Sequence, residues 1–166
     1  MLNEIKSRTA GKTAELNETK VEISELMKAV LADQFVLYTK ARNYHWNVTG
    51  PQFYELHNAF EKIYDELAED IDAVAERIRV LGSKAPGTLK EFLTLSTLQE
   101  EPGNYPQPPA MVQNIVNDFE TVTDKINSAA VKMQSDFNDE VSAGMFYGLV
   151  GKYQKTVWMM KSLLEK

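Results

Sequence analysis

Cysteine is absent from this 166-residue chain, and its absence excludes several classes of protein. Without thiols there is no disulfide scaffold, thiolate zinc site, iron–sulfur cluster or cysteine nucleophile. Long apolar runs and an N-terminal signal-peptide pattern are also missing, so we expect no transmembrane span. The chain has no glycine-rich phosphate loop and no serine-nucleophile elbow. These absences predict a cytoplasmic protein whose chemistry uses other groups.

Positive charge is scarce as well. The chain has 18 Lys and Arg against 24 Asp and Glu, which gives a formal net charge of -6. Such a chain repels polyphosphate over most of its surface, so binding to nucleic acid would need a segregated basic patch. Apolar residues are plentiful at 43%, with seven each of Phe and Tyr. This composition predicts one domain over residues 1–166, large enough to bury a core.

Apolar residues recur along most of the chain at the three- and four-residue spacing of amphipathic helices. Thr19 and Glu22 form a candidate capping box for a first helix ending near residue 47, so residues 1–17 are expected to form a flexible arm. Pro51 suits the first turn of a second helix, which should stop at Gly82.

A long connection of irregular pattern should follow the second helix, because prolines and glycines interrupt residues 83–109. It brackets one short amphipathic piece, 88–95, and two further long helices follow, one over about 111–133 and one over about 139–164. Four long helices joined in this way predict an all-α four-helix bundle, with a short extra helix in the middle connection.

The chain has only two histidines, and they flank a single helix–turn–helix. His45 continues the inward stripe of the first helix, and His57 shares a face of the second helix with Glu61. Asp72 and Glu76 form another pair on that helix, beside its apolar stripe, where a carboxylate should be buried and partnered. Imidazole with carboxylates is a ligand set for iron, manganese or zinc. Acidic residues at this spacing are usually a solvated face, but two inward histidines with two inward carboxylates need a common explanation.

The spacing of these pairs bears on how a site could form. The pairs 57/61 and 72/76 are centred 15 residues apart, which is about 22 Å along a helix. One chain therefore cannot bring both pairs to one metal ion. A second copy can, if its second helix packs antiparallel and crosses near residues 66–67, because His57 of one chain then faces Asp72 and Glu76 of the other. The spacing predicts an intersubunit metal site that twofold symmetry creates twice.

Several segments of the chain together resemble the Dps family, the ferritin-like DNA-protection proteins of starved cells. They are residues 43–57 (NYHWNVTGPQFYELH), 65–67, 72–78 (DAVAERI), 81–82, 88–93 (TLKEFL) and 158–161 (WMMK). The resemblance covers about residues 20–165, and the combination of both histidines, the spaced carboxylates and the short middle helix is highly specific. The glutamate–x–x–histidine repeats of ordinary ferritin-like di-iron centres are absent, because Tyr54 stands three residues before His57.

The resemblance implies a hollow homododecamer built from twofold dimers, with ferroxidase sites at the dimer interfaces. On matching positions, His45 and His57 of one subunit act with Asp72 and Glu76 of its neighbour on two iron ions per site. Glu61 matches a carboxylate near the second iron. The implied function is to oxidise Fe(II) with hydrogen peroxide or oxygen, peroxide being the commoner oxidant, and to store ferric iron, which protects the cell from oxidative damage.

Two other functions stay open at the level of the sequence. The first is a nucleoid-associated, DNA-compacting protein with secondary metal chemistry. Such relatives often carry a Lys-rich tail, whereas this chain ends in Leu164-Glu165-Lys166 and its N-terminal Lys and Arg are largely offset by Glu. DNA binding is therefore expected to be weak or absent. The second is a purely structural helical oligomer, which is disfavoured because all four expected ligands are intact.

Overall fold

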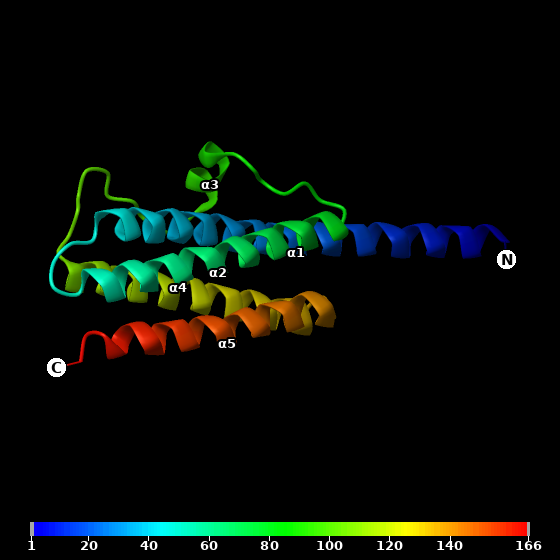
Figure 1. Cartoon of the computed structure of the whole chain (residues 1–166). Helices are drawn as coiled ribbons and strands as arrows, with labels where there is room; N and C mark the ends of the chain where they lie inside the picture. The colour runs from blue at the N-terminus through cyan, green and yellow to red at the C-terminus, as the bar shows by residue number, and fades with distance from the viewer. Residues whose placement is uncertain (1, 166) are drawn as a thin grey trace.

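The computed structural model describes the backbone of residues 2–165 and the side chains of residues 17–165. Its regular elements in that range are all helices: α1 (Leu2–Asn47), α2 (Phe53–Val80), α3 (Leu89–Leu95), α4 (Pro108–Ser135) and α5 (Glu140–Ser162). Figure 1 shows the four long helices side by side, with α3 outside the bundle against α1. The predicted all-α bundle with a short helix in its middle connection is confirmed. Among the described helices, none is long and apolar enough to cross a membrane.

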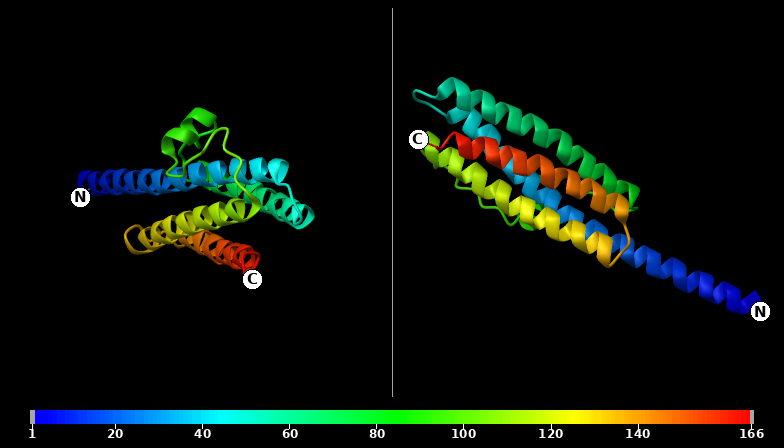
Figure 2. Two further views of the ribbon diagram at one scale, coloured as in Figure 1. Left: turned by 90° about the vertical axis from the view of Figure 1, so that its left-hand side faces the viewer. Right: turned by 90° about the horizontal axis from the view of Figure 1, so that it is seen from below.

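α1 is longer than predicted. It begins at Leu2 and not near Thr19, so the capping box of Thr19 and Glu22 is wrong, and both residues lie inside the helix. Leu, Glu, Lys, Arg and Ala, which favour helices, are common between residues 2 and 18, and proline is absent there. The N-terminal part of α1 extends beyond the bundle (Figure 2). Flexibility of the arm 1–17 stays a prediction, because the side chains of residues 1–16 lie outside the described residues.

Glycines with positive φ follow the C-terminal ends of α1 and α2. Gly50 has φ +102° in the turn between α1 and α2, and α2 begins only at Phe53, so Pro51 lies in the turn and not in the first helical turn. Gly82 has φ +93° just after α2, as the sequence predicts for a helix stop. The short turn makes α1 and α2 an antiparallel pair, which fixes the end of one beside the start of the other.

The middle connection returns along the bundle to the end where α2 began, so α4 runs parallel to α2 (Figure 1). Its short helix lies within the predicted segment 88–95 and starts with a capping box, in which Thr88 Oγ1 accepts from the Glu91 amide and the Glu91 carboxylate accepts from the Thr88 amide. The Phe92 ring of α3 stacks on Phe35 of α1 with centroids 4.2 Å apart. These contacts dock α3 on the outer side of α1.

A buried carboxylate holds the end of this connection in place. Asp33 of α1 is fully buried and accepts hydrogen bonds from Ser96 Oγ (2.7 Å) and from the Thr97 amide (2.6 Å). Lys125 of α4 pairs with the same carboxylate. Since a buried charge is tolerated only when it is paired and hydrogen-bonded, this network joins α1, α4 and the connection.

The hydrophobic core lies between the four long helices. The fully buried large side chains are Ile23, Met27, Leu31, Leu37, Leu56, Phe60, Leu67, Ile78, Met111, Ile115, Phe146 and Tyr153. α5 is anchored at its start by Asp139, whose carboxylate caps the Ser142 amide (3.0 Å) and accepts from Arg77 of α2 (3.2 Å). Asp139 therefore places a negative charge at the N-terminus of α5, where the helix dipole favours one.

Candidate metal centre

The two histidines lie against each other where α1 ends and α2 begins. Their ring centroids are 3.7 Å apart and the rings are nearly parallel, with an interplanar angle of 24°. His45 is buried, with 8% of its surface exposed, and His57 is half-buried. The tight turn at Gly50 brings them together, since twelve residues separate them in the sequence.

Each imidazole is held by the backbone of the other histidine. The Nδ1 atom of His45 lies 2.9 Å from the carbonyl oxygen of His57, and the Nδ1 atom of His57 lies 2.9 Å from the carbonyl oxygen of His45. Because a carbonyl oxygen only accepts, both Nδ1 atoms carry the proton and donate. This leaves Nε2 of each ring as the atom that can bind a metal ion, the arrangement that metal-binding histidines commonly have.

Glu61 completes a three-residue cluster on this end of α2. Ligand atoms of His45, His57 and Glu61 all lie within 4.8 Å of one another. Glu61 is exposed and lies one helical turn beyond His57, as the four-residue spacing predicts. Two imidazoles with one carboxylate and open positions form a ligand set typical of Fe(II) and also suitable for zinc. The cluster therefore offers ligands for a divalent transition metal.

Asp72 and Glu76 do not join this cluster within one chain, as the spacing along α2 predicts. Both side chains are exposed, and neither makes a hydrogen bond or ion pair within residues 17–165. The expectation that they are buried and partnered is wrong for the single chain. The buried carboxylate of α2 is Asp70, which pairs with Lys152 of α5 (2.8 Å). Burial raises the pKa of Asp70 above its ordinary value, against the opposing effect of Lys152.

The exposed carboxylates share one face of α2 with the histidine cluster. Successive separations of four, seven, four and four residues lead from His57 through Glu61, Ala68 and Asp72 to Glu76. The small, exposed Ala68 lies close to the predicted crossing point at residues 66–67, so another helix could approach there closely. This face offers a cluster at one end and two unpartnered carboxylates at the other. Their meeting across two chains stays a prediction.

An aromatic cage around Arg42 borders the cluster, and the sequence did not indicate it. The Arg42 guanidinium lies over the rings of Tyr38, Trp46 and Tyr64 at 5.5, 5.3 and 4.5 Å from their centroids. The helical spacing 38, 42, 46 on α1 was the available signal, but Tyr64 comes from α2. The cage fixes one positive charge beside the cluster.

Tyr64 connects the cage to the cluster. Its ring meets His45 edge-on, with centroids 5.2 Å apart, and its hydroxyl lies 3.4 Å from Glu61 Oε1, at the long limit of a hydrogen bond. Burial raises the pKa of the Tyr64 phenol, and the Glu61 and Asp65 carboxylates add to the rise against the opposing effect of Arg42. Tyr64 therefore stays protonated and able to donate toward Glu61.

Comparisons with known proteins find relatives in sequence and in structure over most of the chain. The family model described as a ferritin-like domain matches residues 24–166. The DNA protection during starvation protein 2 of Bacillus anthracis is 34% identical over 87% of this chain and 98% of its own. The crystal structure of a Dps protein from Bacillus brevis superposes with a TM-score of 0.84 at 32% identity, over 89% of this chain and 98% of that one. The crystal structure of the Vibrio cholerae Dps protein, described as a member of a broad superfamily of ferritin-like diiron-carboxylate proteins, gives a TM-score of 0.85 at 26% identity, over 90% of this chain and 92% of that one.

Proposed function

Because the chain belongs to the Dps family of ferritin-like proteins, we propose that it protects the cell by oxidising Fe(II) and storing the ferric product in a closed shell. The observation that carries this proposal is the reciprocal pairing of His45 and His57, which leaves two Nε2 lone pairs beside the Glu61 carboxylate. Such a half-site lacks enough ligands for two ions. Asp72 and Glu76 of a neighbouring chain are proposed to supply the missing oxygens.

The proposed ligand roles follow from donor chemistry. Imidazole nitrogens of one chain suit Fe(II), and carboxylates from two chains neutralise the charge of two divalent ions held side by side. The carbonyl oxygens that accept from both Nδ1 atoms keep the rings in one tautomer and orientation, so the ligands are set before iron arrives. The protein supplies ligands and orientation, and iron is the substrate.

Pairing the two ions determines the products of the reaction. Two Fe(II) ions give one electron each to hydrogen peroxide, which takes up two protons and leaves as two molecules of water. A single Fe(II) ion would give one electron and release a hydroxyl radical. A site that fills with two ions therefore removes iron and peroxide together without radical damage. Peroxide as the preferred oxidant is part of the proposal.

A twelve-subunit shell is proposed as the assembly, in line with the Dps structures that the chain resembles. Twofold symmetry of an antiparallel α2 pair would give each dimer two equivalent sites. Light scattering should therefore show a particle of about twelve times the 18.8 kDa chain mass. A stable monomer or a 24-subunit particle would contradict the proposal.

The test of the activity is an anaerobic Fe(II) titration followed by peroxide or air, with the ferric product read by its absorbance. Wild-type protein should form the product rapidly with about one peroxide for two Fe(II), and peroxide should act faster than air. His57→Ala should lose this rate, whereas Asp124→Asn, which changes an exposed carboxylate on α4, should keep it. Equal rates for the two variants would reject the histidine half-site as the centre.

A further inference from the structure

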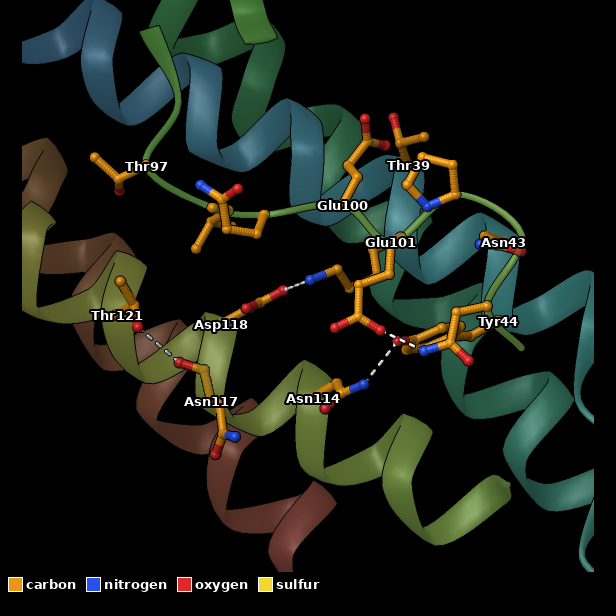
Figure 3. Close-up of a pocket in the computed structure, with 15 residues that line it drawn as sticks. Thr39, Asn43, Tyr44, Thr97, Glu100, Glu101, Asn114, Asn117, Asp118 and Thr121 are labelled. Atoms are coloured by element: carbon orange, nitrogen blue, oxygen red, sulfur yellow. Dashed lines mark hydrogen bonds and ion pairs between the residues drawn. The ribbon is translucent and has the colours of Figure 1, made fainter. Parts of the chain in front are cut away.

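A cavity of about 450 Å³ lies between α1, α4 and the connection that follows α3, and none of the candidate metal ligands lines it. Its size is within the range of small-molecule sites. Figure 3 shows its walls: Tyr44 and Asn43 come from α1, Asn114, Asn117 and Asp118 from α4, and the segment 97–104 closes one side. The metal chemistry proposed above assigns this cavity no role.

The charges around the cavity exclude an anionic ligand. Lys40 is its only lining cation, and this lysine pairs with Asp118 across the floor. Both side chains are mostly buried, with 14% and 16% of their surface exposed. The Lys40 ammonium is therefore already paired with Asp118 and is not free to bind an anion. The Glu101 carboxylate faces the cavity and accepts from Asn104 (Figure 3). A phosphate or carboxylate would meet these acids without a free positive partner.

Apart from the Glu100 carboxylate, the remaining polar side chains that line the cavity are hydroxyls and amides. Tyr44 is 95% buried, with 5% of its surface exposed, and its hydroxyl oxygen accepts from Asn114 Nδ2 at 3.0 Å. No acceptor for the proton of this hydroxyl occurs among the side chains and backbone described between residues 17 and 165, so the proton is available to a ligand. The side-chain carbonyl oxygen of Asn114 and the Glu101 carboxylate are acceptors that line the same cavity.

The cavity therefore offers a ligand one buried donor, the Tyr44 hydroxyl, together with several acceptors. A hydroxyl group on the ligand can use both kinds of partner, because it donates and accepts hydrogen bonds at once. The cavity also has apolar wall area from Leu98, Pro102 and the Tyr44 ring, which suits the C–H surface of a carbon chain or ring. We propose that this cavity binds a neutral polyhydroxylated compound, a sugar or sugar alcohol, held through the Tyr44 hydroxyl and the amides of α4.

The experiment uses the full chain, with D-glucose, sorbitol and trehalose as probes and putrescine as a cationic comparator. Binding is measured by saturation-transfer NMR and by calorimetric titration, because sugars raise thermal stability without binding at a site. Asn117→Trp fills the cavity from an exposed position on α4, and Asn127→Trp makes the same change at an exposed position on α4 that does not line it. Tyr44→Phe removes the donor and keeps the ring.

At least one polyol should bind saturably in the millimolar range, unaffected by Asn127→Trp and abolished by Asn117→Trp. Tyr44→Phe, with its helix content checked by circular dichroism, should weaken binding up to about tenfold, the effect of one hydrogen bond. Binding of putrescine with no binding of polyols would overturn the proposal in favour of an amine site. Absence of any binding, or equal binding by both tryptophan variants, would also overturn it.

Discussion

Two inactive variants should restore activity to each other when their chains are mixed in one assembly. His57 and Glu76 lie 19 residues apart on α2, about 28 Å along the helix, so one chain cannot place both at one iron pair. Under the proposed antiparallel pairing, each site takes its histidines from one chain and Asp72 and Glu76 from the other. His57→Ala and Glu76→Ala should each be inactive when assembled alone, because every site then lacks one ligand.

The recovered activity can be worked out from this geometry. In a mixed dimer, one site receives the altered histidine side and the altered carboxylate side, and the other site receives two intact sides. Random mixing makes about half of the dimers mixed, so about a quarter of all sites should be intact. The expected rate of ferric product formation is therefore up to about a quarter of the wild-type rate.

The assay dissociates equal amounts of the two variants, reassembles them together and measures oxidation of Fe(II) by peroxide. Mass spectrometry of intact dimers verifies that mixed pairs have formed. A mixture of His45→Ala with His57→Ala is the matched control and should stay inactive, since both lesions fall on the histidine side of every site. No recovery in the first mixture, with mixed dimers present, would show that one chain supplies all the ligands and refute the antiparallel arrangement.

Three further predictions concern stability and DNA. Asp72→Asn or Glu76→Gln should leave the melting temperature of the metal-free protein unchanged or raise it, because like charges four residues apart on a helix cost up to about 0.5 kcal/mol; a clear fall in calorimetry would contradict this. Burial opposes ionisation of Asp139, but its Ser142 hydrogen bonds and Arg77 outweigh burial and lower its pKa. Asp139→Asn keeps a capping oxygen but loses the charge that pairs with Arg77, so it should cost up to about 1 kcal/mol at neutral pH in urea unfolding. The difference should shrink as the pH falls through the lowered pKa, where the wild-type carboxylate becomes protonated. Duplex DNA should bind weakly or not at all at about 0.15 M salt in a mobility-shift assay, because the net charge is -6; a tight complex would show an effective basic patch.

Helix periodicity was enough to predict the architecture, because burial in a bundle repeats with the helical turn. Gly82 as the stop of α2 and the short helix within residues 88–95 were placed correctly, since both follow from local sequence pattern. The start of α1 was misplaced for the opposite reason. Thr19 and Glu22 have the residue types of a capping box, but a cap forms only where the helix ends, and the preceding residues continue it.

The identity of the buried carboxylate on α2 was predicted incorrectly although the signal was present. Asp70 lies three residues after Leu67 and four before Val74, both of which are fully buried, so it belongs to the inward stripe. Asp72 is two residues further on and turns away from the core. The partner of Asp70, Lys152, comes from α5, and a pairing over 82 residues cannot be read from local spacing.

The cluster of His45, His57 and Glu61 could be predicted only in part, because one contact in it depends on local helical spacing and the other on tertiary structure. The four-residue spacing of His57 and Glu61 is local, whereas the stacking of the two rings depends on the turn and on two carbonyl acceptors. Asp72 and Glu76 remain without partners in the chain, although their helix is otherwise well packed. A carboxylate that served the fold of one chain would be paired with a cation inside it, as Asp33, Asp70 and Asp139 are. The exposed pair on the face of Ala68 is thus free to meet a second chain, which is what an intersubunit iron site requires.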